Sequence, residues 1–126
     1  MSRNMFNDAL CSSILHSNKN IQLVTLINKQ GRPVNTVSRP KFTTQFQNHM
    51  NEMFFMQCVL QVSMGRDFDK YYGSINYYIC ERKNLTLLSF PLDDHVILVT
   101  VNNNINSMLL ARKIIDKINS LQNQLD

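Results

Sequence analysis

Glycine, proline, cysteine and tryptophan are scarce in this sequence of 126 residues. It holds three glycines, three prolines and no tryptophan, which excludes collagen-like chains and low-complexity chains rich in glycine or proline. The three cysteines, Cys11, Cys58 and Cys80, are an odd number without paired spacing, so they predict free, mostly buried thiols rather than a disulfide framework. With 44% apolar residues, the chain is expected to form a single domain over residues 1–126.

Long apolar runs and concentrated charge are also missing. Runs such as Val96–Val99 are far shorter than the roughly 20 residues that span a bilayer, and the N-terminus lacks the apolar run of a signal peptide. We therefore expect a cytoplasmic protein that meets a membrane only through a partner. The 13 Lys and Arg residues give a net charge of +4 but are scattered. Since nucleic-acid binding calls for a basic stripe with interleaved aromatics, no nucleic-acid partner is expected.

Motifs for chemistry are absent as well. There is no P-loop and no GxGxxG, so nucleotide binding through those motifs is not expected, and no CxxC or HxxxH pair predicts a zinc site. Asp93-Asp94-His95 could act as an acid/base or metal group, but a hairpin turn is the favoured interpretation. Cys58 would need a positioned base to act as a nucleophile, and its apolar surroundings favour a buried thiol. We expect no catalytic residue, no metal and no cofactor.

The apolar periodicity predicts eight helices and strands. They are a helix over residues 2–17, strands Ile21–Asn28 and Val34–Val37, a long helix Lys41–Met64, strands Ser74–Glu81, Leu85–Leu92 and Val96–Val101, and a final helix capped by Asn106 or Ser107. Residues Gly65–Gly73 are predicted to form a loop, and Asp93-Asp94 a tight turn. This α-β-β-α-β-β-β-α order predicts an α/β fold. Its five-stranded, mostly antiparallel sheet would carry one long helix on one face and two helices on the other.

The order of these segments resembles the roadblock family of dynein light chains and GTPase-associated adaptors. The matching segments are the strand "IQLVTLIN", the turn "KQGRPV" with Gly31, the long following helix, and the meander "INYYIC", "LTLLSFPL" and "HVILVTV". The resemblance covers nearly the whole chain. The first helix and the size are most similar to a roadblock subunit of the Ragulator (late-endosomal/lysosomal adaptor) complex or its EGO-type equivalent.

This resemblance implies a non-catalytic scaffold. Such a protein would pair with another roadblock-domain protein, as a hetero- or homodimer, and support Rag-type GTPases beside a lipid-anchored scaffold subunit. The expected setting is TORC1 nutrient signalling on the cytosolic face of the lysosome, vacuole or late endosome. Two alternatives remain open: a dynein-associated light chain in cargo transport, and an accessory regulator of a small GTPase.

The long helix carries two apolar stripes. One consists of Phe42, Phe46, Met50, Met53, Met56, Leu60 and Met64, and we expect it to lie on the chain's own sheet. The other, nearly opposite, consists of Phe55, Cys58, Val59 and Val62. A helix with apolar residues on opposite sides must be covered twice, either by another segment of the chain or by a partner.

A partner is the interpretation we favour, because monomers seldom leave such patches bare. Strand Ser74–Glu81 lacks proline and carries two tyrosines, which suits a pairing edge. In the roadblock family the long helix packs on its counterpart and the third strand pairs edge to edge. The predicted partner interface is Phe55, Cys58, Val59, Val62, Ser74, Asn76, Tyr77 and Tyr78.

Overall fold

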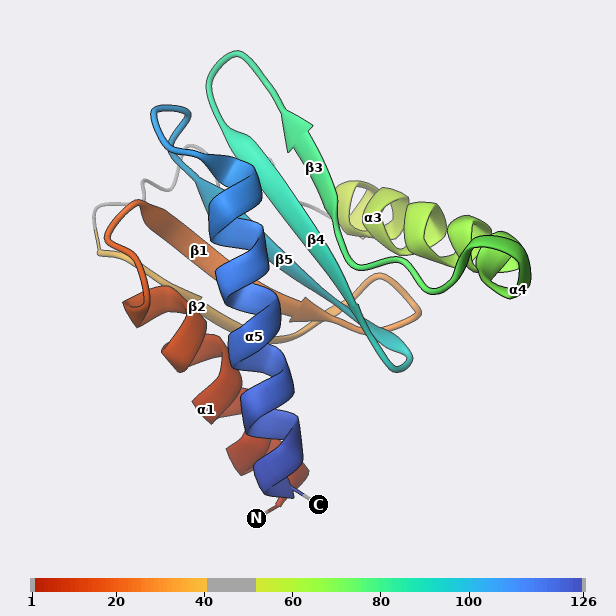
Figure 1. The fold of residues 1–126 in the computed structure, drawn as a ribbon. Coiled ribbons are helices and arrows are strands. Elements are labelled where there is room, and N and C mark those ends of the chain that lie inside the picture. The colour runs from red at the N-terminus through yellow and green to blue at the C-terminus, as the bar shows by residue number, and fades with distance from the viewer. Residues whose placement is uncertain (1, 41–51, 126) are drawn as a thin grey trace.

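The computed structural model describes residues 2–40 and 52–125 (Figure 1). The helices and strands are α1 (Arg3–His16), β1 (Ile21–Ile27), β2 (Pro33–Ser38), α3 (Glu52–Gly65), the 3-10 helix η1 (Arg66–Phe68), α4 (Asp69–Tyr72), β3 (Tyr78–Glu81), β4 (Thr86–Leu92), β5 (His95–Val101) and α5 (Ser107–Leu125). The predicted order of helices and strands is confirmed, with η1 and α4 added between α3 and β3. Part of the predicted long helix, including Phe42, Phe46, His49 and Met50, lies outside the described residues.

The five strands form one antiparallel sheet in the order β2-β1-β5-β4-β3. Strand β5 lies at the centre, as its run of β-branched and aliphatic residues predicts, and β2 and β3 form the two edges. Most residues of β1, β4 and β5 are buried, because helices cover both faces of the sheet. Nearly continuous apolar strands are typical of such an arrangement.

The sheet lies between one helix and two. Helices α1 and α5 pack side by side on one face, and α3 lies on the other (Figure 1). The larger core is on the α1–α5 side, where Phe6, Leu10, Ile14, Phe90 and Ile114 are almost fully buried. A smaller core forms beneath α3. The predicted division into one helix on one face and two on the other is confirmed.

Strand β3 covers only half of the predicted Ser74–Glu81 segment. Tyr78 pairs with Ser89 of β4, and continuing this register by two residues would place Asn76 opposite Pro91. Proline has no N–H to donate to a ladder, so β4 offers a poor template at that point. The strand therefore begins at Tyr78, and Ser74 and Asn76 lie before it.

The loop predicted for Gly65–Gly73 is wrong. Its interior, Arg66–Tyr72, contains neither glycine nor proline and forms η1 and α4 as a continuation of α3. The helix ends at Gly73, whose φ of 86° is unfavourable for other residues. The backbone N–H of Gly73 donates to the Asp69 carbonyl at 2.8 Å.

Two predicted boundaries are confirmed. Asp93 and Asp94 form the β4–β5 turn, with Asp93 at a positive φ of 53°. The Asn106 side chain caps α5 by accepting a hydrogen bond from the Leu109 N–H at 3.1 Å. None of the described helices has the length and apolar content needed to cross a membrane.

Candidate partner-binding surface

Helix α3 has the opposite orientation to the predicted one. Phe55, Val59 and Val62 are buried against the chain's own sheet. They pack with Ile27, Leu87, Val96 and Leu98. Of the residues predicted to lie inward, Met53, Leu60 and Met64 are exposed, whereas Met56 is half-buried against the core beneath α3. Phe55, Val59 and Val62 therefore form the face of α3 that packs on the core.

The physical reason lies in the spacing and shape of the side chains. Phe55, Val59 and Val62 follow at intervals of four and three residues, which gives one narrow helix face. Stiff β-branched side chains pack well on a pleated surface, whereas unbranched methionine adapts to irregular or changing contacts. The predicted inward stripe gained its weight from Phe42, Phe46 and Met50, which lie outside the described residues.

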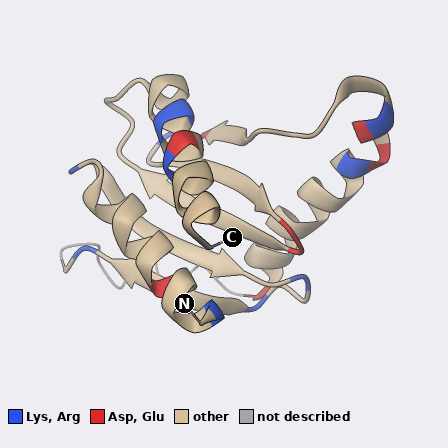
Figure 2. Cartoon of the chain, turned by 60° about the horizontal axis from the view of Figure 1, so that its bottom comes forward, with Lys and Arg blue, Asp and Glu red and all other residues tan. Residues whose placement is uncertain are grey.

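The exposed side of α3 continues through η1 into α4 as one apolar stripe, here called the α3–α4 stripe. Its members, with their exposed fractions, are Met53 (74%), Leu60 (50%), Met64 (66%), Phe68 (58%) and Tyr71 (68%). They follow at intervals of seven, four, four and three residues, as on one side of a helix. Figure 2 shows no Lys, Arg, Asp or Glu along the middle of α3. Contiguous exposed apolar side chains of this kind are typical of interaction sites.

A groove lies between α3 and the edge of the sheet, here called the α3–β3 groove. Its volume is about 680 Å³. Its walls are Phe54, Gln57, Cys58, Leu60, Gln61, Met64, Gly65, Phe68, Tyr78, Cys80, Arg82, Leu87 and Ser89. The Tyr78 hydroxyl donates to the Gln61 carbonyl at 3.3 Å and so fastens the strand to the helix.

Strand β3 forms the outer wall of this groove. Its four residues pair with β4 on one side, and within residues 2–40 and 52–125 no strand pairs with its other side. Of the predicted interface residues, Tyr78 and half-buried Cys58 line the groove, while Ser74 and Asn76 are exposed on the approach to β3. Tyr77 lies on the other face of the sheet, against Phe90 with ring centroids 6.3 Å apart.

Comparison with known proteins gives structural matches alone. No protein-family model and no curated protein matches the chain. The Roadblock/LC7 domain from Streptomyces avermitilis matches with a TM-score of 0.67 and 12% identity, over 94% of this chain and 96% of that one. Myxococcus xanthus MglB matches at 0.68 and 18%, over 100% and 96%. A structure of MglB with tetrameric arrangement matches with a TM-score of 0.61 and 8% identity, over 91% of this chain and 86% of that one. The chain has the roadblock/LC7 fold.

Sequence reasoning identified Met53, Leu60 and Met64 as part of one stripe but placed that stripe against the sheet. It missed the continuation of the stripe beyond Gly65 and the groove. The signal for the continuation was the helical spacing that runs on from Met64 to Phe68 and Tyr71. The glycine at position 65 suggested that the helix stopped there. Gly65 instead has helical backbone angles, φ −64° and ψ −31°. Its missing Cβ leaves room for Ile75 and for the Tyr78 hydroxyl.

The remaining candidates for chemistry lie apart from one another among the described residues. Among the described residues, no group of three or more His, Cys, Asp or Glu could hold a metal ion. Asp93, Asp94 and His95 form the β4–β5 turn and the start of β5. Glu52 pairs with Arg32 at 3.4 Å on an exposed surface, where such pairs contribute little stability.

The three cysteines differ in their surroundings. All are free thiols: Cys11 is buried, Cys58 half-buried and Cys80 exposed. Burial raises the pKa of the Cys11 thiol to about 12, and the Asp8 carboxylate adds to the rise. Burial raises the pKa of the Cys58 thiol to about 11, with a further rise from the neighbouring Cys80 thiolate. Neither Cys11 nor Cys58 has the lowered pKa of a nucleophile.

These two thiols should make the domain less stable in alkali. A thiol with its ordinary pKa of 9.0 ionises above that pH in the unfolded chain, but in the folded state Cys11 and Cys58 stay protonated. Their stabilisation is complete below pH 9 and is lost as pH rises towards 11 and 12. Each contributes a slope of at most about 1.4 kcal/mol per pH unit.

Urea unfolding at several pH values above 9 would measure this slope. The matched variant is Cys11→Ala, which keeps every other titrating group. Its free energy of unfolding should fall less steeply with pH than that of the wild type. Equal slopes would contradict a raised Cys11 pKa.

Proposed function

We propose that this chain is a non-catalytic scaffold subunit of the roadblock family that dimerises with a roadblock-type partner. The observation that carries the proposal is the exposed α3–α4 stripe beside the open edge of β3. A helix face and a free strand edge together can receive the same two elements of a second chain, because antiparallel strands pair edge to edge. Self-association also has a precedent in the MglB structure described as tetrameric.

The proposed interface differs from the predicted one on the helix. Leu60, Met64 and Phe68 replace Phe55, Val59 and Val62, which are buried in the chain's own core. Cys58 and Tyr78 are retained as groove residues, and Ser74 and Asn76 as rim residues before β3. Methionine and tyrosine are enriched in protein interfaces, which agrees with the composition of the stripe.

The finer role proposed for the dimer is support of Rag-type GTPases in TORC1 nutrient signalling at the lysosomal or vacuolar surface. The family resemblance supports it, together with a lipid-anchored scaffold subunit as the membrane tether. A purified Rag-type GTPase pair, added to the chain and a roadblock partner, should co-elute with them. Co-elution with dynein intermediate chain instead would favour a light-chain role in cargo transport.

Leu60→Asp tests the interface. A charge at the centre of the stripe should leave the domain folded but weaken pairing by about 2 kcal/mol, about thirtyfold in Kd. Size-exclusion chromatography with light scattering, on the chain alone and mixed with a roadblock partner, would measure it. The matched control is Met5→Asp, which places the same charge at an exposed site on α1. A wild-type chain that stays monomeric in both settings would refute the proposal.

A further inference from the structure

Three loops meet at one end of the sheet. Ile21, Val101 and Thr86 form one row across β1, β5 and β4, so the segments beyond them lie at the same end. The Asn103 side chain donates to the Arg82 and Lys83 carbonyls at 2.7 and 2.8 Å. This joins the β5–α5 loop to the β3–β4 loop. The Asn102 N–H donates to the Asn20 carbonyl at 3.2 Å and joins the α1–β1 loop to them.

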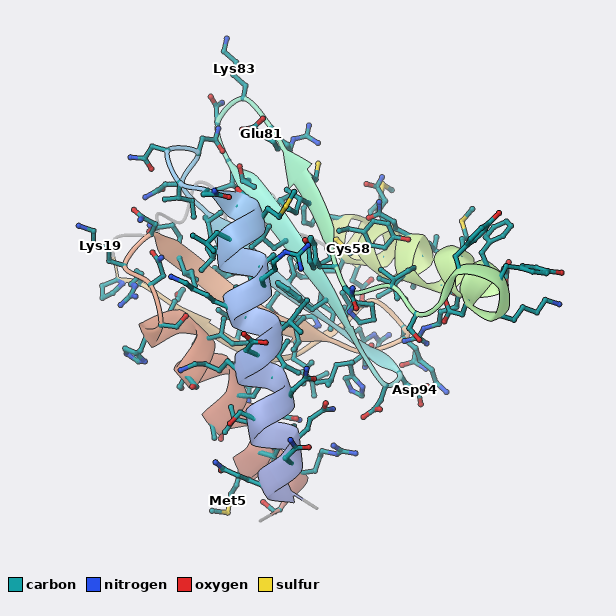
Figure 3. The ribbon with its side chains drawn as sticks, viewed as in Figure 1. Met5, Lys19, Cys58, Glu81, Lys83 and Asp94 are labelled. Atoms are coloured by element: carbon teal, nitrogen blue, oxygen red, sulfur yellow. The ribbon has the colours of Figure 1, made fainter. Side chains whose placement is uncertain are left out.

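Positive charge gathers at this end and on the adjoining first turns of α5. The exposed cations are Lys19, Arg82, Lys83, Arg112 and Lys113. Within residues 2–40 and 52–125, none of these five makes an ion pair with an acid. Figure 3 shows Lys19 and Lys83 projecting into solvent at this end and Asp94 at the opposite end, with Glu81 as the acid beside Lys83. Together with Met108 and Leu109, these five cations are called the basic corner.

Two apolar side chains accompany these cations. Met108 and Leu109 are 55% and 52% exposed, on the side of α5 that faces away from buried Leu110 and Ala111. Arg112 follows Met108 by four residues, and Lys113 follows Leu109 by four residues, so each cation lies one helical turn from an apolar side chain. The result is an apolar pair on α5 bordered by cations. This pair lies outside the α3–β3 groove, although Arg82 of the basic corner also lines that groove.

We propose that the basic corner docks directly on an anionic phospholipid surface, which departs from the expectation that the chain meets a membrane only through a partner. Lysine and arginine near such a surface are attracted by its negative potential, while exposed apolar side chains enter the boundary between headgroups and acyl chains. Nucleic acid fits less well, because the corner carries no aromatic side chain on which a base could stack. Since α5 and α3 lie on opposite faces of the sheet (Figure 1), a dimer formed through α3 leaves this part of α5 uncovered.

Vesicle co-sedimentation of the full chain tests the proposal. Wild type should bind vesicles of phosphatidylcholine with phosphatidylserine and not vesicles of phosphatidylcholine alone, and salt should release it. The double variant Arg112→Glu with Lys113→Glu should bind the anionic vesicles at least about tenfold more weakly. The matched control, Lys29→Glu with Lys70→Glu, changes net charge equally at exposed sites on the β1–β2 turn and α4, and should bind within about threefold of wild type.

A second pair of measurements separates a membrane surface from other anions. Met108→Ser with Leu109→Ser keeps all charges and should also weaken binding to anionic vesicles. Wild type should bind single-stranded poly-U RNA more weakly than these vesicles. The proposal fails if wild type does not sediment with anionic vesicles at low salt, or if both charge variants lose binding equally. It also fails if the serine variant binds like wild type, or if RNA binds as tightly as the vesicles.

Discussion

Replacing Val62 by aspartate is expected to destabilise the domain strongly. Val62 is 1% exposed and packs in the core beneath α3 with Ile27 and Leu98. A carboxylate at this position would lose its hydration without gaining an ion-pair partner, and the methyl groups that it replaces would leave part of their contacts unfilled. We expect a loss of about 4 kcal/mol, which is a large share of the roughly 5–15 kcal/mol that stabilises a typical domain.

Leu60→Asp is the matched control for this prediction, two residues away on the same helix. Leu60 is 50% exposed, so the free energy of unfolding of the Leu60→Asp variant should differ from that of the wild type by less than about 1 kcal/mol. Urea unfolding followed by circular dichroism would compare the two variants. Unfolding by Leu60→Asp, with Val62→Asp stable, would mean that α3 packs on the sheet by its other side.

The sheet could be predicted from the sequence because its central strands have one consistent pattern. "IQLVTLI" and "HVILVTV" are apolar on both faces, and such runs stay unambiguous when helices cover both sides. The residue types in the turns predicted where the strands end. The Asn28 side chain accepts hydrogen bonds from the N–H groups of Gln30 and Arg32, both at 3.0 Å, beside Gly31 at positive φ. In these segments local preference and tertiary packing agree.

The orientation of α3 could not be predicted in the same way, because both of its sides are apolar. Periodicity identifies the stripes but does not say which one faces the sheet. That choice depends on how the side chains fit Ile27, Val96 and Leu98 on the opposing strands, which a helical wheel does not contain. The candidate surface was misplaced for this reason, although its location on α3 and β3 was predicted and remains the proposal.

The length of β3 also depended on a neighbour in space. The segment Ser74–Glu81 has strong strand preference by itself. Its extent is set by Pro91, which lies on the adjacent strand and is fifteen residues from Asn76 in sequence. Strand preference is sensitive to such cross-strand context, so the edge available for pairing is shorter than predicted.

Gly31→Ala is expected to cost about 2–3 kcal/mol, because Gly31 joins the β1–β2 turn to α3. Its φ is 79°, where any side chain is strained. A Cβ at this position would lie 3.1 Å from the Met56 Cε and 3.2 Å from the Met56 Cα and Cβ. The Cα belongs to the helix backbone and cannot rotate away, so α3 or the turn must shift. The free energy of unfolding in urea would report the loss.

Gly65→Ala is the contrasting variant, since it also adds a Cβ, here at the last residue of α3. There the new atom would meet the ends of two side chains, the Ile75 Cδ1 and the Tyr78 hydroxyl, which must move aside at the cost of the hydrogen bond from Tyr78 to the Gln61 carbonyl. The φ of −64° suits alanine. Alanine also favours the helix over glycine by roughly 0.5–1 kcal/mol, so the net change should stay within about 1 kcal/mol. A Gly31→Ala variant as stable as Gly65→Ala would show that the turn has room to spare. Helix α3 would then be held by the contacts of Phe55, Val59 and Val62, and close packing against the β1–β2 turn would not be required.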